Sequence, residues 1–253
     1  MRPVEEQGYV IVAVDSAGVD YVRCARMLVE SLKTHHPTAR VCLVTDKPVA
    51  DTLFDYVHLL PTVDANAYAN DAAVFKLTPF RETIKLEADM LIASPIAHWW
   101  DLFRHRDVVI STGCRTWQGN VSTVRHYRQV FDQNHLPDVY NAITYWRLSD
   151  TAKEFFDLVR DIFANWDQFR KLIKFAPATA DTDLVYAIAA QIMGSERVTM
   201  PFATYPQIVH MKQHHAGTTD RWTHELTWEF DPLRINTQAQ WGAFHYHIKE
   251  WQP

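Results

Sequence analysis

Two short apolar runs with a helical pattern between them constrain the fold more than any other part of the chain. YVIVAV (9–14) is continuous and β-branched, as in a strand buried on both faces, and ARVCLVTD (39–46) has the same character. The segment between them carries apolar residues at helical spacing before a proline: Tyr21, Cys24, Ala25, Leu28 and Leu32, then Pro37. Strand, helix and strand within about 40 residues form a βαβ unit, which predicts a parallel sheet.

The rest of the chain continues this alternation of elements. Further strands are expected where apolar runs are short: TIKLEADMLIA (83–93), DVVIST (107–112) and VYNAITYWRL (139–148). Helices are expected where apolar residues recur with the helical period: FKLTPFRE (75–82), IAHWWDLF (96–103), TAKEFFDLVRDIFANWDQFRKLI (151–173) and DTDLVYAIAAQIM (181–193). Ser149 and Asp150 would cap the third of these helices, and Gly194 would end the fourth. No internal repeat or linker is evident, so we predict one domain over residues 1–253.

Composition excludes several classes of protein. With 25 basic and 30 acidic residues, the chain has no general electrostatic attraction to nucleic acid or to an anionic membrane. Three cysteines without a CxxC pair indicate neither a disulfide framework nor a cysteine zinc site. The apolar run near the N-terminus is about six residues, against about 20 for a membrane span. We therefore expect a cytoplasmic protein with no membrane partner.

Two carboxylates lie inside the apolar pattern of RETIKLEADMLIA (81–93). Residues two apart in a strand project to the same side, so Glu87 and Asp89 are expected to face one point. The carboxyl ends of strands are where open α/β sheets collect ligands, and two oxygen ligands suit Mg²⁺ or Mn²⁺. The plain alternative is an edge strand whose acidic side chains face water.

Several segments follow one another in a characteristic order. After the βαβ start come Lys76-Leu77, the D-x-D-like Glu87-Ala88-Asp89 with IAHWWDLF behind it, and Asn141-Ala142-Ile143 in a later strand. In this order they resemble GT-A glycosyltransferases, most closely the glycogenin-like retaining family, and the chain is comparable in size to small viral enzymes of this build. The resemblance implies a GT-A fold, a mostly parallel sheet flanked by helices. Residues 1–95 would form the nucleotide-binding half, and residues 96–253 the acceptor half that closes the site.

The chain departs from the family pattern at two positions. Glu87 replaces the first aspartate of D-x-D, which keeps the charge on a longer side chain. Ile143 stands where the family has a glycine, and its side chain bears on how closely donor or acceptor approaches that strand.

The resemblance also implies a metal and diphosphate site. Asp89 would bind Mn²⁺ or Mg²⁺ directly, with Glu87 on the metal or on the ribose of the donor. HYHIKEW (245–251) resembles a shortened form of the family's C-terminal histidine motif. His247 is the preferred metal ligand with His245 as the close alternative, and Lys249 would hold the diphosphate. His210, followed by Lys212, is a competing copy.

Other residues are assigned to the donor and the acceptor by the same resemblance. Asp15 and Tyr21 would hold the base and ribose of a nucleotide-sugar, with a UDP-sugar as the expected donor, and Lys76 and Arg81 would contact phosphate or balance the metal carboxylates. Asp181, Asp183 and Asn141 would contact sugar or acceptor. The two aspartates are equally typical of a plain helix N-terminus.

Three other functions compete with sugar transfer. A dinucleotide-binding oxidoreductase is disfavoured, because no G-x-G-x-x-G follows the first strand. A metal-dependent phosphohydrolase or nuclease could use the carboxylates of Glu87, Asp89, Asp181 and Asp183. A non-catalytic nucleotide-sugar-binding module would need only the fold. A zinc site is also an alternative, although no HExxH spacing occurs in the sequence. Its candidate ligands are the C-terminal histidines His214, His215, His224, His245 and His247.

The acceptor is not specified by the sequence. GCRTWQGNVSTVRHYRQVF (113–131) carries cationic side chains and aromatic residues that could grip a phosphate-bearing acceptor, namely Arg115, Arg125, His126 and Arg128. Small viral enzymes of similar build glycosylate hydroxymethylated DNA bases, so modified DNA and glycans are both candidate acceptors. The plain alternative is that 113–131 is a solvated polar segment with no role in binding the acceptor, and the net charge of −5 on the chain favours it.

Overall fold

The structure of the chain is a computed structural model. It describes residues 3–113, 128–200 and 242–246 with their side chains, and the backbone alone for 208–211, 215–216, 226–230 and 235–239.

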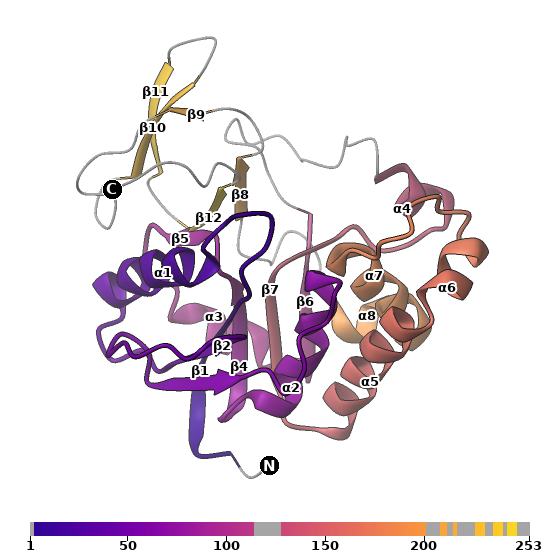
Figure 1. Ribbon diagram of the computed structural model, residues 1–253, viewed down its shortest axis with the longest axis horizontal. Coiled ribbons are helices and arrows are strands. Elements are labelled where there is room, and N and C mark those ends of the chain that lie inside the picture. Colours follow the sequence, from indigo (N-terminus) through magenta and orange to yellow (C-terminus); the bar gives the residue numbers. More distant parts are fainter. Residues whose placement is uncertain are drawn as a thin grey trace.

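A six-stranded sheet forms the centre of the molecule (Figure 1). Its order is β3-β2-β1-β4-β7-β6, and β7 runs antiparallel to both of its neighbours while the other pairs are parallel. The strands are β1 (Glu5–Ala13), β2 (Val41–Thr45), β3 (Tyr56–Leu59), β4 (Phe80–Glu87), β6 (Val108–Thr112) and β7 (Val139–Arg147). The expected mostly parallel α/β sheet is confirmed.

Helices cover both faces of this sheet, and the pattern of β1 explains why. Tyr9, Ile11 and Ala13 belong to one apolar cluster, which includes the long helix α1 (Tyr21–His35) and the short α3 (His98–Phe103). Val10 belongs to a second cluster on the opposite face, which includes α5 (Asp150–Ala164) and α7 (Thr182–Met193). A strand buried on both faces is continuously apolar, as the sequence of β1 is.

Shorter elements connect these layers. They are η1 (Ala67–Ala73), α2 (Val74–Leu77), α4 (Gln129–Gln133), α6 (Trp166–Leu172) and α8 (Ser195–Val198). None of the helices within the described ranges is long and apolar enough to cross a membrane.

Two small sheets complete the fold. One contains β5 (Met90–Ile92), β12 (Ala243–Tyr246) and β8 (Ile208–Met211) in the order β5-β12-β8, and it brings the C-terminal part of the chain beside the end of β4. The other contains β9 (His215–Ala216), β10 (Leu226–Phe230) and β11 (Ile235–Ala239), and it stands away from the central sheet in Figure 1.

Three predicted elements differ from those observed. The helix expected over 75–82 is confined to α2, because Thr78 precedes Pro79 and adopts an extended ψ of 133°, after which β4 begins at Phe80. The helix expected over 151–173 is broken at Asn165, whose side-chain amide donates to the Asp161 carbonyl, 2.8 Å away. The strand expected over 83–93 is divided into β4 and β5.

Two helix caps follow the sequence prediction. Ser149 accepts a hydrogen bond from the Ala152 N–H at 3.2 Å and begins α5. Gly194 ends α7 with a φ of 89°, a conformation that favours glycine.

Candidate functional site

The division between β4 and β5 sets the position of the two predicted carboxylates. β4 ends at Glu87, Ala88 and Asp89 form a turn, and β5 begins at Met90. The Tyr246 N–H of β12 donates to the Asp89 carbonyl at 3.1 Å, so the turn is held by the C-terminal strand. The two side chains therefore converge through a turn, whereas the sequence predicted convergence along one strand.

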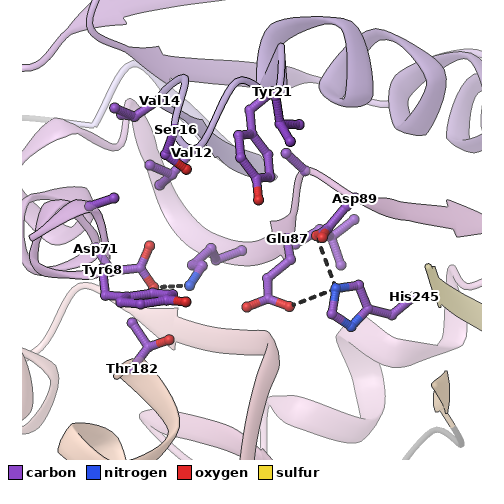
Figure 2. Close-up of a pocket in the computed structure, with 15 residues that line it drawn as sticks. Val12, Val14, Ser16, Tyr21, Tyr68, Asp71, Glu87, Asp89, Thr182 and His245 are labelled. Carbon is purple, nitrogen blue, oxygen red and sulfur yellow. Dashed lines mark hydrogen bonds and ion pairs between the residues drawn. The ribbon is translucent and has the colours of Figure 1, made fainter. Parts of the chain in front are cut away.

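His245 completes a cluster with these carboxylates. It lies on β12 opposite Met90, and its Nε2 is 3.0 Å from Asp89 Oδ1 and 3.4 Å from Glu87 Oε2. One ligand atom from each of the three residues lies within 4.8 Å of the others, and Figure 2 shows the three side chains pointing toward one point. Two carboxylates and an imidazole are a suitable donor set for a divalent cation such as Mn²⁺.

Tyr140 of β7 fixes the orientation of the His245 ring. Its hydroxyl forms a hydrogen bond with His245 Nδ1, and the two rings lie 5.6 Å apart between centroids. This contact leaves Nε2 directed at the two carboxylates. A hydrogen bond on the other ring nitrogen is the usual way in which a metal-binding histidine is held.

The electrostatic environment of the cluster favours a cation. Burial, followed by the nearby charge of Asp89, raises the pKa of Glu87 to about 7, while His245 acts in the opposite direction. The cost of holding two carboxylates together in a partly buried site falls when a divalent ion binds between them.

A cavity of about 390 Å³ opens beside the cluster. One wall comes from the segment after β1 and includes Val14, Val19 and Tyr21. Burial, with a smaller contribution from Asp89, raises the pKa of Tyr21 to about 12, so its hydroxyl stays protonated and can donate a hydrogen bond. The opposite wall comes from η1 and the start of α7, with Tyr68 and Thr182 (Figure 2).

A buried ion pair beside the cavity was missed by sequence reasoning. Lys85 of β4 pairs with Asp71 of η1, and both residues line the cavity. The signal was available in part, since Lys85 has the same strand parity as Glu87 and lies in an apolar run, where a lysine needs a partner. The identity of that partner, 14 residues earlier, could not be read from spacing.

The predicted acceptor-side residues lie next to the cavity. Asp181 caps α7 by accepting from the Leu184 N–H at 2.8 Å, as the plain helix-start interpretation predicted. Asp183 accepts from Arg128 Nη2 at 2.7 Å and from the Asn141 N–H at 2.8 Å. Among these neighbouring positions, Thr182 is the residue that lines the cavity.

The predicted nucleotide-side residues divide into two groups. Tyr21 lines the cavity, and its backbone N–H donates a hydrogen bond to Asp15 Oδ1 at 3.1 Å. Asp15 also forms an ion pair with Lys47. Lys76 is exposed on α2 and does not line the cavity. Arg81 pairs with Glu6 and is the second residue of the strand that Glu87 ends, so it lies about 20 Å away from the cluster along β4.

Several predicted residues cannot be placed. His247 and Lys249 lie outside the described residues, as do Arg115, Arg125 and His126. His210 is opposite His245 in the register of β8 and β12, and its side chain is not described. The preference for His247 over His245 therefore stays a prediction, while His245 is the histidine observed beside both carboxylates.

Comparison with solved structures identifies the fold. The chain is similar to mouse xyloside xylosyltransferase 1, with a TM-score of 0.53 and 14% sequence identity over 87% of this chain and 90% of that one. It is also similar to the galactosyltransferase LgtC, solved in complex with donor and acceptor sugar analogs, with a TM-score of 0.55 and 12% identity over 94% and 86%. No family model and no curated protein matches the sequence. The fold is therefore GT-A, as predicted, and the glycogenin-like relationship stays a prediction.

Proposed function

We propose that this protein is a metal-dependent glycosyltransferase that moves a sugar from a nucleotide-sugar to an acceptor hydroxyl. The observation that carries the proposal is the cluster of Glu87, Asp89 and His245, which lies at the carboxyl end of β4 and opens on the cavity. Its position is that of ligand sites in open α/β sheets. The similarity of the fold to two solved glycosyltransferases supports the same reaction class.

The residues of the cluster would hold Mn²⁺ or Mg²⁺ against the diphosphate of the donor. Asp89 and Glu87 supply carboxylate oxygens, His245 supplies Nε2, and Tyr140 keeps that nitrogen in place. A bound divalent ion would neutralise the charge that develops on the departing diphosphate. Lys249 is proposed to add a second positive charge there, on the basis of the family resemblance.

The two walls of the cavity suit different parts of a nucleotide-sugar. The aromatic ring of Tyr21 and the valines beside it offer a surface for the base, with Asp15 nearby for the ribose, and a UDP-sugar is the proposed donor. Thr182, Asp183 and Asn141 are proposed to face the transferred hexose or pentose and the acceptor. Modified DNA and glycans both stay candidates for the acceptor.

A metal-dependent phosphohydrolase is the second candidate, because clustered carboxylates also serve two-metal phosphoryl chemistry. The bonds of the other two aspartates favour transfer instead. Asp181 caps α7, and Asp183 is held by Arg128 and Asn141, so neither joins the metal cluster in the described part of the chain. A non-catalytic binding module on this fold would bind donor without turnover.

Thermal unfolding with Mn²⁺ and a panel of nucleotide-sugars tests the proposal. Wild type should gain melting temperature from Mn²⁺ plus donor, and Asp89→Asn should lose that gain because a carboxylate ligand is removed. Asp101→Asn is the matched control, since Asp101 is exposed and pairs only with Arg104 among the described residues. Equal gains in wild type and Asp89→Asn would contradict the metal assignment.

A product assay separates the three functions. Release of UDP from a UDP-sugar, with sugar joined to an acceptor or to water, indicates a transferase. Degradation of DNA or of a phosphate ester without sugar transfer indicates the phosphohydrolase, and binding without any product indicates the module.

A further inference from the structure

We propose that Asp71, held in place by Lys85 and Asn141, is the subsite that binds hydroxyl groups of the transferred sugar. This inference rests on the function proposed above and specifies how the donor is recognised. It concerns a residue that no sequence motif identified.

A fixed network holds the Asp71 carboxylate. Lys85 pairs with Asp71 Oδ2, and Asn141 Nδ2 donates to the same oxygen at 3.0 Å. Thr144 Oγ1 donates to Asn141 Oδ1 at 2.6 Å, which orients the amide with its Nδ2 toward Asp71. The carboxylate is therefore held rigidly before any ligand arrives.

One oxygen of Asp71 is left for a ligand. Both donors observed within the described residues reach Oδ2, and Asp71 lines the cavity with its side chain 12% exposed. The Lys85 side chain is 2% exposed, so the carboxylate is the more accessible member of the pair. A carboxylate oxygen accepts hydrogen bonds from hydroxyl groups, and bonds to a charged acceptor are the stronger kind.

The arrangement around the cavity indicates which part of the donor reaches Asp71. The labelled side chains in Figure 2 form three groups: Tyr21 with Val12 and Val14, the cluster at Glu87, and Asp71 with Tyr68 and Thr182. With the diphosphate at the cluster and the base on the valine and tyrosine wall, the sugar extends to the third group. That group carries hydroxyl and carboxylate oxygens, as a sugar site needs.

The charge of the pair fits this assignment. Lys85 balances Asp71, so a third carboxylate beside Glu87 and Asp89 adds no net negative charge to the region that must receive a diphosphate. The competing explanation is that the ion pair of Asp71 and Lys85 only stabilises the fold. Removing the Asp71 carboxylate alone would not distinguish a structural role from a sugar-binding role. Leaving Lys85 buried without its partner could unfold the chain.

The test is titration calorimetry in the presence of Mn²⁺ with UDP, UDP-glucose, UDP-galactose and UDP-xylose. The variants are Asp71→Asn and the double variant Asp71→Asn with Lys85→Met, in which no unpaired charge is left buried. Asp101→Asn serves as the control. Circular dichroism and melting temperature establish that each variant is folded.

We expect both variants to weaken binding of the preferred UDP-sugar at least tenfold relative to UDP, while UDP itself binds within about twofold of wild type. Unchanged discrimination between UDP-sugar and UDP in the folded double variant would overturn the proposal, as would an equal loss of both ligands. Failure of wild type to bind UDP or any of these donors would instead reject the function proposed above, so the two failures are distinguishable.

Discussion

Tyr140 and His245 form the contact on which the geometry of the metal cluster depends most directly. The Tyr140 hydroxyl is hydrogen-bonded to Nδ1, and the opposite nitrogen lies 3.0 Å from Asp89. Without it the ring could rotate about its side-chain bonds, although the strand would keep its place. The hydroxyl therefore contributes to metal affinity more than to folding.

Tyr140→Phe should weaken Mn²⁺ binding by about tenfold or more, because partners that orient a metal ligand typically contribute tenfold to a hundredfold in affinity. Calorimetric titration with Mn²⁺ measures this directly. Tyr145→Phe is the matched control, since Tyr145 lies on the same strand and its hydroxyl has no hydrogen-bond partner among the described residues. Equal affinities in the two variants would show that the ring is held by other contacts.

At the scale of elements, β4 positions Glu87 at the site and pairs with β1. The close contact between these two strands depends on a glycine of β1. Gly8 pairs with Thr83, and a Cβ placed on Gly8 would lie 2.4 Å from the Phe80 ring, which is fully buried. The ring therefore packs directly against the backbone of β1. This contact lies at the end of β4 that is remote from Glu87.

Gly8→Ala should destabilise the protein by about 1–3 kcal/mol, because the added methyl group overpacks the contact with Phe80. Urea unfolding measures the change. Phe80→Leu should be destabilising alone, and the double variant should lose less stability than the sum of the two single changes, since the smaller side chain makes room. Strict additivity in this cycle would show that the strain is relieved elsewhere.

Elements also show what the sequence could and could not predict. The carboxylates of Glu87 and Asp89 were found from their spacing in an apolar run, but the turn between them depends on β12, more than 150 residues later. The partner of Lys85 was missed for the same reason, because a contact between separate elements produces no regular spacing in the sequence. Arg81 was predicted to lie near the site because it is close to Glu87 in the sequence. Both residues belong to β4, and each residue of a strand adds about 3.3 Å, so the two side chains are far apart.

At the scale of the whole molecule, the two apolar clusters share the central sheet. The cluster with α1 includes residues from Tyr9 to Tyr246, and the cluster with α5 includes residues from Val10 to Val198. The nucleotide-binding half and the acceptor half proposed from the sequence therefore do not have separate cores among the described residues. We therefore expect the two halves to unfold together.

We expect a single cooperative unfolding transition for residues 1–253, as predicted for one domain. Leu28→Ala in α1 and Ile162→Ala in α5 remove fully buried side chains from the two clusters, and each should destabilise the protein by about 2–5 kcal/mol. Because the sheet is common to both clusters, each variant should shift the same transition, whether it is followed by tryptophan fluorescence or by circular dichroism. Two transitions, each sensitive to only one of the variants, would show that the halves are separate folding units.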